Sequence, residues 1–386
     1  MFLDDQLRDL QRATRRFVDD ELIPNESELV DGEALPAALH DRLRARLMEL
    51  GVWALGVPKQ YGGGGAGVLA QLVVTEELSR SLLGLQLAGR TGHPLPLLYE
   101  ATPEQQQRYL LPVVRGERIG AFALTEPTGG SDPVGNMRTR ARQVDAGWVI
   151  DGRKCFISLG DVADHIVVFA ITDPDAGSRG VTAFLVDAQT PGFSVVRRIP
   201  TMGSTAPAEL DFTDCLVPDD ARVSEVGGGF ALAQQLLAGA RLEIGARAIG
   251  ACDRLIDLAL GYTRNRESFG IPLADHQGAQ WTIADCAVDL DATRWMTYAA
   301  AARVDEGADT RLQVSMVKVF ASEALGRVAD RVMQLFGGWG YAKGLPVERF
   351  YREARMWRIV DGPNEIHRVV IARQLARSGI AALRPA

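Results

Sequence analysis

Apolar residues recur at the helical period through the first third of the chain. The first such run places Leu7, Leu10 and Phe17 among arginines and aspartates, and Pro24 follows it. This pattern is typical of an amphipathic helix with one buried face, and proline closes such a helix. The predicted helices span about residues 6–22, 35–50 and 68–83, and a fourth begins after Thr102, its expected N-cap.

Between about residues 121 and 218 the period changes to that of β-strands. Short runs rich in β-branched and aromatic residues alternate with glycine, proline and aspartate. The pairs Asp151-Gly152 and Pro191-Gly192 predict turns between closely spaced antiparallel strands. Several short strands in succession are typical of a small barrel or a sandwich. The predicted strands include residues 148–151, 165–172, 180–188 and 193–198.

Beyond Gly227-Gly228-Gly229 the helical period returns in longer runs. Long helices with apolar stripes pack as an antiparallel bundle. We therefore predict an α+β chain of three domains: an all-helical domain over 1–120, a β domain over 121–226 and a helical bundle over 227–386. The predicted helices of the last domain span about residues 230–264, 276–305, 311–336, 346–357 and 364–378.

The composition excludes several classes of protein. The chain has 386 residues, of which 47% are hydrophobic and 24% charged, as in a packed globular protein. A net charge of −7 without long single-sign runs argues against a nucleic-acid or membrane partner. The four cysteines form no C-x-x-C pair, so neither a disulfide framework nor a zinc site is expected. The acidic N-terminus and the lack of a long apolar run predict a cytoplasmic protein.

The most specific segment is residues 122–132, Phe-Ala-Leu-Thr-Glu-Pro-Thr-Gly-Gly-Ser-Asp. Its small residues and hydroxyls, on a loop that enters the β domain, allow the backbone to approach a flat ligand. A turn capped by Ser131 and Asp132 is the alternative. The segment resembles the T-E-P-x-x-G-S-D signature of the acyl-CoA dehydrogenase family, and the resemblance covers nearly the whole chain. The family's fold has a helical domain, a small β-barrel and an antiparallel four-helix bundle. The resemblance implies FAD or thioester contacts for Phe122, Leu124, Thr125, Gly130 and Ser131.

A second segment is Lys154-Cys155-Phe156-Ile157-Ser158. Family members usually have a tryptophan where Phe156 stands. The resemblance implies that Phe156 is a smaller aromatic wall against the flavin, that Ile157 borders the cofactor, and that Ser158 supplies a hydroxyl. The alternative is an ordinary alternating strand with Phe156 in the core.

Two further segments lie at helix ends of the bundle, residues 266–270 and 334–341. An arginine at a helix end suits a pyrophosphate. The segment after Phe336 has more glycines than a helix end needs. The alternative for residues 266–270 is a solvated helix end. The resemblance implies that both segments contact the FAD of a neighbouring subunit, in a homotetramer or homodimer. The implied cofactor residues are Arg266, Ser268, Phe269, Gln277, Gln334, Gly337 and Gly338.

The segment Arg358–Arg368 contains Asp361 followed by Gly362. Many family members have their catalytic glutamate where Asp361 stands, so the resemblance implies that Asp361 is the base. Aspartate is shorter by about 1.5 Å of reach. A branch of the family has a similar D-G-P-(D/N)-E-(V/I)-H stretch. Pro363 and Glu365 are implied cofactor contacts. The alternative role for Asp361 is the N-cap of the last helix.

Some relatives place the glutamate before a bundle arginine, which here is Arg241. That position holds Ala240, and Glu243, the nearest acid on this helix, is a weak rival. The resemblance implies that Ser131, Arg241, Gly362 and Arg90 border the substrate. The family's pantetheine aspartate is Ala238 here, and the loop 202–205 lacks the usual arginine. A carrier-protein thioester therefore stays open beside acyl-CoA.

The function that the resemblance implies is α,β-dehydrogenation of an acyl thioester, an oxidation of a CH–CH group. FAD is the implied cofactor and an electron-transfer flavoprotein the implied acceptor. Two alternatives stay open. One is a flavin oxidase like nitroalkane oxidase, which also uses an aspartate base. The other is a non-catalytic flavin-binding scaffold, against which the net charge of −7 counts.

Overall fold

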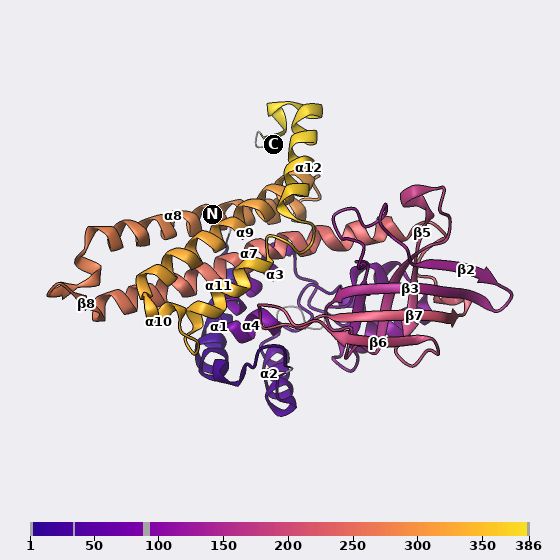
Figure 1. Cartoon of the computed structure of the whole chain (residues 1–386), viewed down its shortest axis with the longest axis horizontal. Helices are drawn as coiled ribbons and strands as arrows, with labels where there is room; N and C mark the ends of the chain where they lie inside the picture. Colours follow the sequence, from indigo (N-terminus) through magenta and orange to yellow (C-terminus); the bar gives the residue numbers. More distant parts are fainter. Residues whose placement is uncertain (1–2, 34, 88–92, 384–386) are drawn as a thin grey trace.

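The computed structural model describes residues 3–33, 35–87 and 93–383. A helical N-terminal part, a β-sheet and a long helical bundle follow one another, as predicted (Figure 1). The sheet lies at one end of the bundle. Along the described chain, no helix is both long enough and apolar enough to cross a membrane.

The N-terminal helices differ from the prediction at two places. Helix α1 (Asp5–Phe17) runs on as a π-helix (Val18–Leu22) and a 3-10 helix (Ile23–Glu28), so Pro24 does not end the helical segment. Pro24 lies in the first turn of the 3-10 helix, where its missing N–H is not needed. The elements that follow are α2 (Ala37–Glu49), α3 (Val68–Leu78), α4 (Leu82–Leu87), α5 (Pro103–Gln105) and α6 (Leu111–Val114).

The predicted helix over 68–83 is wrong in its second half, because α3 ends at Leu78 and a separate helix, α4, begins at Leu82. The buried carboxylate of Glu26 accepts hydrogen bonds from Ser81 Oγ and from the Leu82 backbone N–H, both at 2.8 Å. It thereby caps α4 from another segment of the chain. The predicted N-cap Thr102 is confirmed: it forms a capping box with Gln105.

The middle part is a seven-stranded mixed sheet in the order β1-β4-β2-β3-β7-β6, with β5 paired to β4. The predicted turn at Asp151-Gly152 is wrong, since both residues lie inside β3, where the register shifts. Pro191-Gly192 lies in a turn, but the strands on either side of it do not pair with each other. The strands are β1 (Gly120–Ala123), β2 (Arg140–Val144), β3 (Gly147–Ile157), β4 (His165–Ile171), β5 (Val181–Asp187), β6 (Phe193–Arg198) and β7 (Ala208–Val217).

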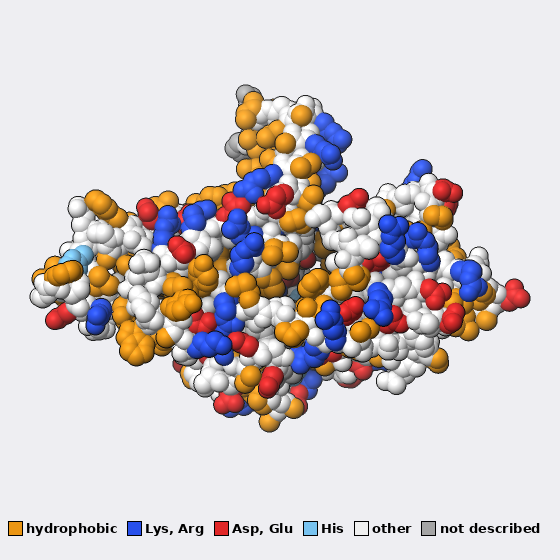
Figure 2. Space-filling model, viewed as in Figure 1, with side chains coloured by type: hydrophobic (Ala, Val, Ile, Leu, Met, Phe, Trp, Pro, Cys, Tyr) orange, Lys and Arg blue, Asp and Glu red, His pale blue; other side chains and the backbone are white. Residues whose placement is uncertain are grey.

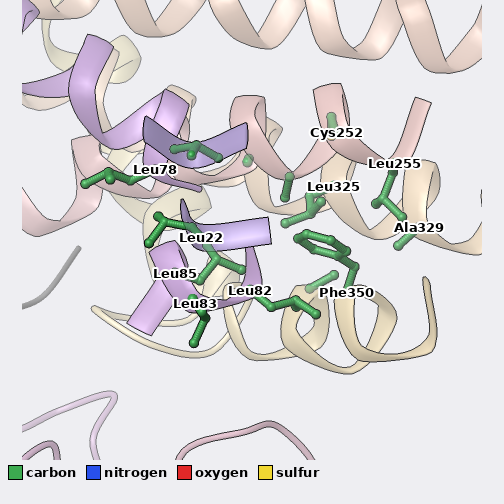
Figure 3. Close-up of a cluster of buried hydrophobic side chains, with 14 of the residues drawn as sticks. Leu22, Leu78, Leu82, Leu83, Leu85, Cys252, Leu255, Leu325, Ala329 and Phe350 are labelled. Atoms are coloured by element: carbon green, nitrogen blue, oxygen red, sulfur yellow. The ribbon is translucent and has the colours of Figure 1, made fainter. Parts of the chain in front are cut away.

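The C-terminal part is built on three long helices, α7 (Gly229–Asn265), α8 (Gln277–Asp305) and α9 (Arg311–Phe336). The short strands β8 (Glu267–Ser268) and β9 (Ile271–Pro272) join α7 to α8, and α10 (Gly338–Tyr341), α11 (Pro346–Met356) and α12 (Asn364–Ser378) complete the chain. Helix α11 packs along the bundle, whereas α12 packs against α9 at its start and then projects away from the bundle (Figure 1). Apolar side chains of the N-terminal helices and of the bundle, including Leu22, Leu78, Leu325 and Phe350, form one shared core (Figure 3).

Candidate active site

Asp361 lies on a short loop between α11 and α12 whose backbone takes an uncommon conformation. Its φ is 55°, and that of Gly362 is 93°. A side chain at position 362 would put its Cβ 3.2 Å from Nε2 of His367, in a conformation that only glycine adopts readily. A non-glycine residue at positive φ is strained and needs support from its surroundings. The loop is therefore held in a specific shape.

Three side chains supply that support through the backbone carbonyls of the loop. The carbonyl of Asp361 accepts hydrogen bonds from Arg241 Nε at 2.9 Å and from His367 Nε2 at 3.2 Å. The carbonyl of Gly362 accepts one from Lys318 Nζ at 2.7 Å. Arg241 comes from α7, Lys318 from α9 and His367 from α12. The loop is thus tied to the long helices α7 and α9 and to the first turns of α12.

The electrostatic surroundings of Asp361 suit a base. Burial raises the pKa of its carboxyl, while the positive charges of Arg241 and Arg247 oppose the rise. A carboxylate with a raised pKa accepts a proton from carbon more readily than one at the ordinary value. Burial lowers the pKa of His367 to about 4, so its ring is neutral near pH 7 and donates from Nε2.

The two alternatives to this role fit less well. Helix α12 has Pro363 at its N-cap and no side-chain cap, so the interpretation of Asp361 as the helix cap is wrong. The rival carboxylate, Glu243, is bound to Arg247, with 3.0 Å between Oε2 and Nη2. Arg247 also donates to the Leu85 carbonyl and lies over the ring of Trp357. Asp361 makes no comparable ion pair within 4 Å among the described residues.

The structure brings two of the sequence motifs side by side. The backbone N–H of Cys155 donates to the Thr125 carbonyl at 2.9 Å, which joins the 125–131 loop to the end of β3. Beneath the loop, the carboxylate of Glu126 accepts hydrogen bonds from Lys154 Nζ and from the backbone N–H groups of Arg138 and Thr139. Glu126 is therefore structural, and it leaves Thr125 and the exposed Gly130 and Ser131 on the outer side of the loop.

Phe156 does not lie in the core, so the interpretation of its segment as an ordinary alternating strand is wrong. Its φ is 57°, its side chain is 60% exposed, and the pairing of β3 with β7 shifts between Lys154 and Ile157. An exposed aromatic ring on an irregular strand end is free to cover a flat ligand. Ser158 is exposed as well, whereas the Ile157 side chain is buried in the core of the sheet.

Phe122 and Leu124 face an apolar cluster. Leu124 is buried in it, and the partly buried Phe122 packs against it, with its ring 5.0 Å from that of Phe169. Their side chains therefore support the loop from inside. Pro363 is partly buried, and Glu365 is exposed on the first turn of α12. The predicted substrate residue Arg90 lies outside the described residues.

The two remaining motifs meet at the end of the bundle farthest from the sheet (Figure 1). There an open pocket of about 570 Å³ is lined by Arg266 and Ser268 on one side and by Gly337 and Gly338 on the other. Apolar side chains gather on the surface at this end, among them Phe269, 98% exposed, and the exposed Trp339 and Tyr341 (Figure 2). Gln277 and Gln334 are exposed at the same end.

The sequence matches three domains of one family along almost its whole length. These are "Acyl-CoA dehydrogenase, N-terminal domain" over residues 4–117, the middle domain over 121–215 and the C-terminal domain over 227–376. The chain belongs to the acyl-CoA dehydrogenase family. The resemblance, the fold and the class of enzyme, an oxidoreductase acting on CH–CH groups, are thereby confirmed.

Individual members of the acyl-CoA dehydrogenase family are similar over nearly their full lengths. The acryloyl-CoA reductase (NADH) of Anaerotignum propionicum is 38% identical over 379 residues, covering 95% of this chain and 94% of the relative. The solved structure of butyryl-CoA dehydrogenase from Megasphaera elsdenii is 31% identical with a TM-score of 0.88, over 97% and 99% of the two chains. That of PigA with FAD and proline is 28% identical with a TM-score of 0.89, over 97% and 98%.

Sequence reasoning assigned no role to three residues of this site. Lys318, His367 and Lys154 stand inside regular helices and a strand, where a polar residue is ordinarily at the surface. All three are buried in the structure and bind backbone carbonyls of the site's loops. A lysine at a core position of a helical period is a signal that could have found Lys318, since Val317 and Ala321 beside it are buried.

Proposed function

We propose that this enzyme oxidises an acyl thioester to the α,β-unsaturated product, with FAD as cofactor and Asp361 as the base. The observation that carries the proposal is the Asp361 loop, on which a carboxylate with a raised pKa is fixed in a strained conformation by Arg241, His367 and Lys318. Strain and a shifted pKa together are typical of functional groups. The similarity to butyryl-CoA dehydrogenase supports the substrate class.

The chain's own groups have two tasks in this reaction. The carboxylate of Asp361 takes the α-proton. The backbone N–H of the same residue donates to the thioester oxygen, where negative charge develops as the proton leaves. A fixed donor at that point is worth several kcal/mol because it requires no reorganisation. Arg241 and His367 hold the Asp361 carbonyl and so restrict the backbone of the residue that carries both groups.

The residues of the sheet fit a flavin. Phe156 offers an exposed ring, Ser158 an exposed hydroxyl, and the loop from Thr125 to Ser131 the exposed residues Gly130 and Ser131. When bound, FAD supplies the acceptor for the β-hydride. The solved structure of PigA with FAD supports this choice of cofactor.

The pocket at the far end of the bundle supports a homo-oligomer. Arg266 and Gly338 line a pocket next to β8 and α10. These elements lie at the end of the bundle away from the sheet, whose strand β3 includes Phe156 (Figure 1). We propose that this pocket, with Ser268 and Gly337, receives the distal part of the FAD held by a neighbouring subunit, in a homotetramer or homodimer. The exposed Phe269 beside it supports burial against another chain.

Replacing Arg266 by alanine tests this assignment. The variant is expected to bind FAD roughly ten- to a hundredfold more weakly, because a charge-assisted contact to a phosphate is lost, typically about 1.5–3 kcal/mol. Titration of the apoprotein with FAD, followed by flavin fluorescence, measures the change. Arg264, exposed two residues earlier, is the matched control, and its alanine variant should bind FAD like the parent. Equal affinities for both variants would reject the role of Arg266.

The nature of the thioester and of the electron acceptor belongs to the proposal as well. Free acyl-CoA and an acyl carrier protein are both compatible with the chain, and an electron-transfer flavoprotein is the proposed acceptor. Loop 202–205, which lacks the usual arginine, is fixed through Ser204, whose backbone N–H and hydroxyl both donate to Glu353 at 2.6 Å.

Anaerobic mixing with a panel of acyl-CoA thioesters tests the function. At least one member of the panel is expected to bleach the visible absorption of the bound flavin within one turnover. A flavin oxidase like nitroalkane oxidase would instead be reduced by a small nitroalkane and reoxidised rapidly by oxygen. A non-catalytic scaffold would keep an oxidised flavin with every compound, including the same acyl groups on a carrier protein.

A further inference from the structure

Lys318 places a charged group inside the helical bundle, where apolar side chains are expected. It lies in the middle of α9, and its side chain is fully buried. Among the described residues no carboxylate lies within the 4 Å that defines an ion pair with its ammonium group. Its two acceptors are instead the Gly362 carbonyl at 2.7 Å and Asn364 Oδ1 at 2.8 Å. A buried ammonium is costly, so its retention calls for a role.

We propose that Lys318 is a positioning residue for the base. It fixes the shape of the Asp361 loop, and its buried positive charge favours the ionised form of the Asp361 carboxylate. The inference rests on the proposed function, because it assigns Lys318 its effect through Asp361.

Lys318 holds a different carbonyl from the other two supporting side chains. Arg241 and His367 both hold the carbonyl of Asp361, whereas Lys318 holds the next carbonyl, that of Gly362. These two peptide groups follow the residues with positive φ. With both carbonyls held, the backbone on the C-terminal side of Asp361 is restricted, which limits the positions that its N–H and carboxylate can take. Loss of either anchor would let the strained loop relax.

A second contact makes the anchor rigid. Asn364, the first residue of α12, accepts from Lys318 through Oδ1 and donates through Nδ2 to Ser322 Oγ and to Glu323 Oε1, both at 3.0 Å. Ser322 and Glu323 lie on α9, one turn after Lys318. The start of α12 is therefore fastened to α9 on the same side as the loop. A satisfied buried network of this kind resists displacement.

The positive charge of Lys318 supports the base, as its hydrogen bonds do. Burial raises the pKa of Asp361, and the positive charges of Arg241, Arg247 and Lys318 lower it. Burial also lowers the pKa of Lys318 to about 8, so the ammonium is charged at pH 7. The other titratable or charged groups that face the pair are Glu243 of α7, Glu323 of α9, and Glu365 and His367 of α12. A base must be ionised, so activity falls as the pH drops through the raised pKa of Asp361. The pH range over which activity falls is the acid limb of the pH profile. Removal of one positive charge raises the pKa of Asp361 further and so moves this acid limb to higher pH.

Lys318→Met tests the inference, because methionine has a similar length and no charge. Two rates are measured against pH: reduction of the bound flavin by a good acyl-CoA, and exchange of the α-hydrogens of acetyl-CoA for deuterium in D2O. Acetyl-CoA has no β-hydrogen, so its exchange reports proton removal alone. We expect both rates to fall roughly ten- to a hundredfold at pH 7, as for a displacement of about 1 Å at a reacting group. KM is expected to change little, and the acid limb of kcat/KM to move to higher pH.

Ser322→Ala is the matched control. It removes another buried polar group of the same network, one turn along α9, and keeps the ammonium. Its acid limb should stay where the parent's is. Lys318→Arg keeps the charge and disturbs only the fit, so it should lose rate without moving the acid limb. If Lys318→Met does not fold, Lys318→Gln takes its place with the same expected results.

The outcomes separate this inference from the proposed function. A parent that neither reduces its flavin nor exchanges α-hydrogens would reject the function itself. An active parent, together with a Lys318→Met variant whose rate per bound flavin and acid limb match the parent's, would reject the role of Lys318. An unchanged acid limb with a reduced rate would overturn the charge effect, and the inference with it, because a merely structural lysine gives that result.

Discussion

Asp361→Asn is expected to keep FAD and acyl thioester bound and to lose flavin reduction by roughly 10²–10⁴-fold, the usual contribution of a general base. Asparagine has almost the same size as aspartate and cannot take a proton from carbon. The loop should keep its shape, because Arg241, His367 and Lys318 hold backbone carbonyls and not the Asp361 side chain. Rapid anaerobic mixing with the best acyl-CoA, followed at the flavin's visible band, measures the loss.

Asp361→Glu is the informative companion. It installs the glutamate that the resemblance gives for many family members and adds about 1.5 Å of reach. If the loop brings the backbone closer to the substrate to suit an aspartate, the longer side chain is misplaced, and the rate should lie between those of the parent and the asparagine variant. An asparagine variant that reduces its flavin at the parental rate would move the base elsewhere. Glu243→Gln would then be the next variant to measure.

The long elements were predictable from the sequence because local pattern decides them. The helix predicted over 311–336 matches α9 residue for residue, and the strand over 193–198 matches β6. Periodicity failed where distant groups decide the structure. A new helix, α4, begins at Leu82 because Glu26, 56 positions away in sequence, caps its first turn. Asp151-Gly152 has the composition of a turn, yet β3 continues through it beside Thr139, which approaches Gly152 too closely for a side chain.

Only those parts of the candidate site that lie in recognisable motifs could be predicted from the sequence. The Asp361 segment, the loop 125–131 and Phe156 were found because glycine, proline and aromatic residues stand in a recognisable order. Their supports were not found. Lys318 lies 43 positions before Asp361 in sequence and inside an apolar stripe, and only the packing of α9 under the loop brings the two together. Support of this kind depends on tertiary packing, which no short motif records.

Lys154→Met is expected to destabilise the β domain by about 3–5 kcal/mol, the usual effect of removing one partner of a buried ion pair. Lys154 is fully buried, and its ammonium lies 2.8 Å from Glu126 Oε1. Burial lowers the pKa of Lys154 to about 8, so the pair is charged at pH 7. Burial alone would raise the pKa of Glu126, but Lys154 and the N–H groups of Arg138 and Thr139 outweigh it and lower the value.

The loss of Lys154 should therefore leave a buried carboxylate beneath the loop that carries Thr125 and Ser131. Thermal unfolding of the apoprotein, followed by circular dichroism, measures the change in stability, and FAD titration measures its effect on the loop. Lys59→Met, at an exposed lysine, is the control and should shift stability by no more than about 0.5 kcal/mol. The double variant Glu126→Gln/Lys154→Met removes both charges and should be more stable than Lys154→Met alone, because no unpaired charge stays buried. If Lys154→Met unfolds at the same temperature as Lys59→Met, the pair contributes nothing to the fold, and the loop owes its position to the Cys155–Thr125 backbone contact and to the hydrogen bonds that Glu126 accepts from Arg138 and Thr139.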